Sequence, residues 1–140
     1  MSHQVVTLTG QEAAERLIPV LRDYAVKVSA LNDRAADIIP GLNVATILYA
    51  VALDAARLVC LRDALDKPIS AITQQASGLL EHAELESVVW AELKLRLDEL
   101  EEHLHFSKLM TGYLAALLKN SPQVAAIRKQ VEQYRYKAPF

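Results

Sequence analysis

The sequence has too little cysteine and glycine to build several common kinds of functional site. Its 140 residues include one cysteine, Cys60, which can form neither a disulfide within the chain nor a cysteine-based zinc site by itself. The four glycines are scattered, so neither a phosphate-binding loop nor a dinucleotide-binding fingerprint can be formed. The nucleophile motif G-x-S-x-G is also absent. These absences indicate no catalytic residue and no cofactor, and the apolar surroundings of Cys60 predict a buried side chain.

Long hydrophobic runs and an excess of positive charge are lacking as well. The longest apolar run, residues 44–53, is much shorter than the roughly 18–20 residues that cross a bilayer. The first six residues lack the basic region and apolar stretch of a signal peptide. The formal net charge is −2 and the isoelectric point about 6.1, which argues against a nucleic-acid-binding protein. We expect a soluble cytoplasmic protein that binds neither membranes nor nucleic acid.

Helical periodicity is the only regular pattern in the sequence. Hydrophobic residues make up 52% of the chain and charged residues 23%, a composition typical of a folded globular domain. Apolar residues recur at steps of three and four through most of the chain, which predicts amphipathic helices. The sequence therefore predicts an all-α protein, a single domain over residues 1–140 that forms a bundle of about five helices. Residues 1–8 are expected to be extended or disordered.

Capping residues and prolines predict the limits of the first helix. Thr9 and Glu12 have the spacing of a capping box, in which each side chain satisfies an unpaired backbone N–H. Pro19 is expected to kink or split the helix, because it removes a hydrogen bond and its ring clashes with the preceding turn. Pro40 followed by Gly41 is expected to end it.

The remaining helices are predicted from the same signals. The segment 43–66 is apolar on nearly every face, which is typical of the most buried helix of a bundle. Asp66 and Pro68 are expected to start a short helix that ends near Gly78. A long helix near 82–119 and a last helix near 122–136 complete the prediction.

The long helix near 82–119 carries two apolar stripes that are offset around its axis. The first keeps an alternating spacing of three and four over about two heptads, as in a short coiled-coil seam: Trp90, Leu93, Leu97, Leu100 and Leu104. A continued seam would place Ser107 inside, and the apolar pattern shifts there to a second stripe: Phe106, Leu109, Met110, Tyr113 and Leu117. One stripe can face the chain's own core and the other a partner. We predict an interface at the first stripe, with Trp90 as its aromatic anchor.

Two clusters of polar residues offer alternatives that the sequence does not favour. Glu102 and His105 have the E-x-x-H spacing of di-iron bundles, but the partner motifs are missing, and His103 and His105 point to different sides of a helix. We therefore expect no metal site. Asp54 and Arg57 are expected to form an ion pair at the edge of the core.

Charge is distributed unevenly along the chain. Residues 81–102 are rich in acidic side chains, and residues 128–137 are rich in basic ones. These segments are either two solvated faces or a basic stretch that docks on an acidic helix of the same or another chain.

Two classes of function remain open. The first is a non-enzymatic, self-associating interaction protein, such as an adaptor, a chaperone-like protein or an assembly subunit; the high apolar content and a mean hydropathy of +0.13 favour it. A protein of this class is expected to form at least a homodimer, and a further protein partner is compatible with it. The alternative is a small all-α enzyme or ligand-binding bundle. Its pocket would lie between helices, lined by Tyr49, Trp90, Met110 and Tyr113 and completed by Arg57 or His103.

Overall fold

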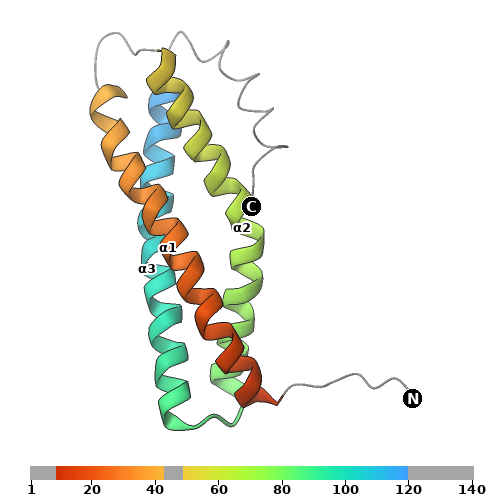
Figure 1. Cartoon of the computed structure of the whole chain (residues 1–140). Coiled ribbons are helices and arrows are strands. Elements are labelled where there is room, and N and C mark those ends of the chain that lie inside the picture. The colour runs from red at the N-terminus through yellow and green to blue at the C-terminus, as the bar shows by residue number, and fades with distance from the viewer. Residues whose placement is uncertain (1–8, 43–48, 120–140) are drawn as a thin grey trace.

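Three long helices account for nearly all of the chain that the structure describes. The computed structural model describes residues 9–42 and 49–119, which form α1 (Gly10–Leu42), α2 (Tyr49–His82) and α3 (Ser87–Lys119). The helices lie side by side in one bundle, with α1 and α3 running in the same direction and α2 in the opposite one (Figure 1). The prediction of an all-α bundle is confirmed, and these ranges contain no strand. The predicted helix near 122–136, residues 1–8 and the start of the segment 43–66 lie outside the described residues.

The prediction of five helices is wrong because proline does not end the helices where it was expected to. α1 passes through Pro19 and Pro40 as far as Leu42. α2 passes through Pro68 to His82, so the short helix expected after Asp66 is the second half of α2. A proline inside a helix costs about 3 kcal/mol. Each of these helices buries an apolar stripe over more than 30 residues, and this long contact outweighs the local cost.

The core lies along the line where the three helices meet. α1 contributes a stripe at steps of three and four that includes Leu21 and Val28, both fully buried. The described part of the segment 43–66 is buried on most of its circumference, since only Ala50, Asp63 and Asp66 are exposed there. Cys60 is 2% exposed within this segment, as predicted for a small buried hydrophobe.

The start of α1 is capped by Thr9. The Thr9 hydroxyl oxygen accepts a hydrogen bond from the Glu12 backbone N–H at 3.1 Å, as the capping box predicts. The Glu12 carboxylate instead accepts a hydrogen bond from the Thr9 hydroxyl at 3.0 Å. The cap thus satisfies one free N–H of the first turn and fixes where the helix begins.

The short connection between α2 and α3 is tied to the beginning of α1. The Gln11 side-chain oxygen accepts a hydrogen bond from the Glu86 backbone N–H at 3.1 Å. Gly10 packs so closely on this connection that a Cβ at its position would lie 2.7 Å from the Cβ of Ala83. The Trp90 indole N–H donates to the Leu80 backbone oxygen at 3.2 Å across the same turn. These contacts fix the angle at which α3 leaves the connection.

Within the described ranges, none of the helices combines the length and the apolar character that a bilayer-spanning segment requires.

Candidate interaction surface

The first stripe of α3 faces the chain's own core. Leu93, Leu97 and Leu100 are at most 3% exposed, and Leu104 is half-buried against them. Trp90 is the exception: it is 42% exposed, and its indole N–H donates a hydrogen bond to the backbone oxygen of Leu80 in the last turn of α2. The stripe predicted as an interface is therefore mostly an internal contact of one chain, and only Trp90 keeps a large exposed surface.

The core seam of α3 also continues farther than the sequence indicated. Ser107 is fully buried, and beyond it Met110, Leu114 and Leu118 are at most 9% exposed. The expectation that the seam stops after about two heptads is thus wrong. The second predicted stripe divides here, because Met110 faces the core while its neighbour Leu109 faces solvent.

Ser107 can be buried because a charged residue of α2 donates a hydrogen bond to its hydroxyl oxygen. The Nε–H of Arg62 donates to the Ser107 hydroxyl oxygen at 2.8 Å, and its Nη1 is paired with Asp66 one turn along α2. Arg62 is only 4% exposed, whereas the Asp66 side chain is 59% exposed. A buried guanidinium requires such partners, because an uncompensated charge in the core is strongly destabilising. The spacing of four residues accounts for the ion pair of Arg62 with Asp66, whereas the contact with Ser107 of α3 is seen only in the structure.

A second buried polar contact links α1 to the same part of α3. Asn32 is 7% exposed and donates from its side-chain amide to the backbone oxygen of His103 at 3.2 Å. His103 and Ser107 are one turn apart, so α1 and α2 both make a polar contact with α3 at one level of the bundle. Sequence reasoning did not single out Asn32, whose place in an otherwise apolar stripe is the only signal it gives.

The opposite side of α3 exposes large apolar side chains. We call this set the outer stripe; it consists of Val88 (78% exposed), Leu95 (51%), Phe106 (52%), Leu109 (61%) and Tyr113 (44%). Successive members are separated by seven, eleven, three and four residues, all of which return to the same face of an α-helix. Phe106, Leu109 and Tyr113 belong to the second stripe of the sequence analysis. Their exposure shows that this part of it points away from the core.

Ion pairs border the outer stripe in the first half of α3. Lys94 pairs with Asp98 at 3.0 Å, and Arg96 pairs with Glu92 and Glu99 at 2.9 Å each. The pKa of Arg96 is raised above its usual range, chiefly by the hydrogen bond to Glu92 and further by the charges of both glutamates. Arg96 therefore stays positively charged and neutralises part of this acidic segment. The predicted pair of Asp54 and Arg57 is also present, at 3.4 Å, with both side chains 42% exposed.

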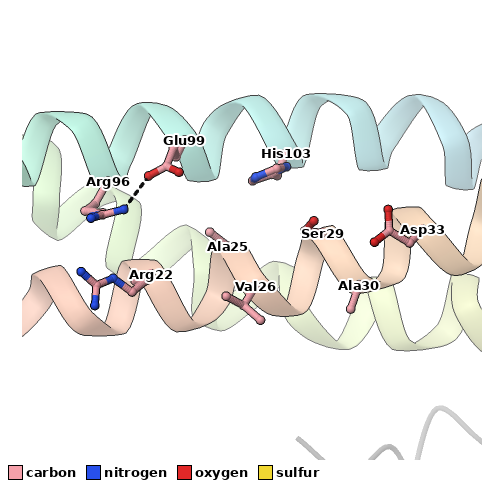
Figure 2. Close-up of a pocket in the computed structure, with 9 residues that line it drawn as sticks. All are labelled: Arg22, Ala25, Val26, Ser29, Ala30, Asp33, Arg96, Glu99 and His103. Atoms are coloured by element: carbon pink, nitrogen blue, oxygen red, sulfur yellow. Dashed lines mark hydrogen bonds and ion pairs between the residues drawn. The ribbon is translucent and has the colours of Figure 1, made fainter.

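A groove between α1 and α3 is lined by both charged and apolar side chains (Figure 2). It encloses about 350 Å³, and Arg22 and Arg96 extend their guanidinium groups at one end while Asp33 lies toward the other. His103 points into the groove from α3. Of the pocket residues expected for a ligand-binding bundle, only His103 lines this groove; Trp90, Met110, Tyr113 and Arg57 do not, and the Tyr49 side chain lies outside the described residues.

The two histidines of α3 lie in different surroundings. His103 is half-buried at the groove, whereas His105 is exposed. Among residues 9–42 and 49–119, no group of three or more His, Cys, Asp or Glu side chains could hold a metal ion.

No protein-family model, curated protein or solved structure matches the chain.

Proposed function

We propose that this chain is a non-enzymatic, self-associating helical interaction protein that forms at least a dimer. The observation that carries the proposal is the outer stripe, since five large apolar side chains on one face of α3 are 44–78% exposed. Apolar surface grouped in this way is typical of an interaction site, whereas scattered exposed residues such as Val26 on α1 are ordinary.

We place the interface on the outer stripe because the first stripe of α3 already packs in the core of its own chain. A partner could reach Leu93, Leu97 or Leu100 only if the three helices separated. Phe106, Leu109 and Tyr113 need no such change, and two of them are aromatic, the residue class that concentrates binding energy. A role as an adaptor, a chaperone-like protein or an assembly subunit in the cytoplasm fits this surface, and the single buried cysteine suits a reducing compartment.

The test is the mass of the full chain in solution at micromolar concentration, measured by sedimentation equilibrium. The wild-type chain should be at least dimeric. Leu109→Glu should shift it to a monomer without loss of helical circular dichroism, because Leu109 is 61% exposed and contributes little to the fold. Val26→Glu is the matched control: Val26 is 64% exposed on α1, so this variant should associate like the wild type. A monomeric wild-type chain would contradict the proposal.

A second candidate function is the binding of a small anionic ligand in the groove between α1 and α3. The observation that favours it is the guanidinium group of Arg22 at one end of the groove, beside Arg96, which already pairs with Glu99 of the same groove at 2.9 Å (Figure 2). Titration with phosphate and with citrate, followed by the shift in melting temperature, tests it. Arg22→Gln should abolish any shift, whereas Arg16→Gln, an exposed change elsewhere on α1, should not.

A further inference from the structure

We infer that the second half of the outer stripe, with Phe106, Leu109 and Tyr113, binds the same residues of a second copy in antiparallel orientation, centred between Ser107 and Lys108. This inference rests on the proposed self-association and adds its geometry. The outer stripe fits a heptad pattern, in which two core positions each recur every seven residues. One core position is occupied by Val88, Leu95, Glu102, Leu109 and Ala116. The other is occupied by Glu92, Glu99, Phe106 and Tyr113. The apolar residues of the stripe are concentrated in the second half of α3, and its acids lie in the first half.

This uneven distribution selects the orientation. In a parallel pair, each residue faces its own equivalent, so Glu92, Glu99 and Glu102 would each oppose a second copy of themselves. Like charges placed directly against one another across an interface are destabilising. An antiparallel pair avoids all three of these contacts.

The antiparallel register follows from the most apolar layers. Centring the pair between Ser107 and Lys108 places Phe106 against Leu109 of the second copy, and the symmetry of the pair repeats this contact. Both residues are more than half exposed in the single chain, so both can bury new apolar area. The same register places Glu102 beside Tyr113 of the second copy and Glu99 beside Ala116. The Glu102 stem can then pack on Tyr113 while its carboxylate reaches solvent, and the Glu99 carboxylate keeps its ion pair with Arg96 of its own helix.

The charged residues beside the stripe agree with this register. Asp98 and Lys119 are three heptads apart, so both occupy the same flanking position of the pattern, and in an antiparallel pair such positions lie along one edge of the interface. The exact counterpart of Asp98 is Leu117 of the second copy, and Lys119, two residues or about 3 Å farther along the helix, is the nearest residue at that flanking position. The symmetry of the pair gives this contact twice per dimer. Asp98 also pairs with Lys94 of its own helix at 3.0 Å, so it would lie between two lysines. The contact from Asp98 to Lys119 spans about 32 Å of helix.

A charge exchange tests the orientation. Asp98→Lys makes both facing positions basic, and Lys119→Glu makes both acidic, so each variant alone should dimerise about tenfold more weakly than the wild type. An equimolar mixture of the two variants should recover the affinity, because every pair then joins opposite charges. Sedimentation equilibrium of each variant and of the mixture measures this, with Asp23→Lys and Lys67→Glu as controls. These two substitutions change the net charge by the same amounts at exposed sites on α1 and α2, and should change neither affinity.

Disulfide trapping gives an independent measure in a Cys60→Ala background. A mixture of Asp98→Cys and Lys119→Cys chains should form a covalent heterodimer under mild oxidation, while Asp98→Cys alone should not cross-link with itself. Self-cross-linking of Asp98→Cys, or a dimeric wild type for which the charge exchanges behave like the controls, would overturn the antiparallel arrangement and leave self-association standing. A monomeric wild type would overturn both.

Discussion

The buried contact between Arg62 and Ser107 gives the sharpest test of how this bundle is held together. Ser107→Ala removes the acceptor of the Arg62 Nε–H and leaves that donor in the core. A hydrogen bond to a charged group contributes about 1.5–3 kcal/mol. Breaking a buried ion pair completely costs about 3–5 kcal/mol, but Asp66 still neutralises Arg62 in this variant. We therefore expect the lower range, a loss of about 1.5–3 kcal/mol in the free energy of unfolding.

A double-mutant cycle separates this contact from the effects of each residue alone. Ser107→Ala, Arg62→Met and the double variant are compared by urea denaturation followed by circular dichroism, with Ser77→Ala, an exposed site on α2, as control. The control should stay within about 0.5 kcal/mol of the wild type. The double variant should be less destabilised than the sum of the single variants by about 1–2 kcal/mol, because neither the Arg62 donor nor the Ser107 hydroxyl is left in the core, and Asp66, which loses its partner, is 59% exposed to solvent. Additive losses, or a Ser107→Ala variant as stable as the control, would show that the contact does not stabilise the fold.

Two further predictions concern the backbone of α1 and α2. Gly10→Ala should destabilise the bundle by about 1–3 kcal/mol in urea denaturation, because the new Cβ meets that of Ala83 at 2.7 Å. Gly78→Ala, with no atom within 4 Å of its Cβ, should instead stabilise the bundle by about 1 kcal/mol. Equal effects of the two substitutions would contradict the packing at Gly10. Pro19→Ala should raise the melting temperature. Pro19 lies in the middle of α1 with an exposed side chain, and alanine restores a helical hydrogen bond and relieves strain, which together contribute up to about 3 kcal/mol. A lower melting temperature would show that the proline is not strained there.

The sequence predicted those features of the fold that depend on residues within a single helix. The capping role of Thr9 and the apolar stripe of Leu93, Leu97 and Leu100 depend on local spacing, which is visible in the chain, but the direction in which that stripe faces is not. The course of α1 and α2 through their prolines was not visible, because the compensating burial comes from neighbouring helices. The same holds for the buried polar residues Arg62 and Asn32, because their partners lie far away in the sequence on another helix.

Ser107 shows this most clearly, since its partner Arg62 lies 45 residues away on another helix. The spacing within α3 indicates that Ser107 is a polar residue in the seam, but it does not indicate that Ser107 has a hydrogen-bond partner. The division between Leu109 and Met110 had the same origin, because both are apolar and only the closure of the bundle determines which one is exposed.

The polar contacts also explain why the outer stripe stays outside. α3 is apolar on two faces, so hydrophobic burial alone does not determine which face enters the core. Turning the outer stripe inward would remove Ser107 from Arg62 and would bury Glu102, an exposed acid of α3, which is costly. Asn32 adds to this preference, because its bond to the His103 backbone oxygen requires the present rotation of α3. The polar layer therefore selects one of two apolar faces for the core, and by doing so leaves the other face available to a partner.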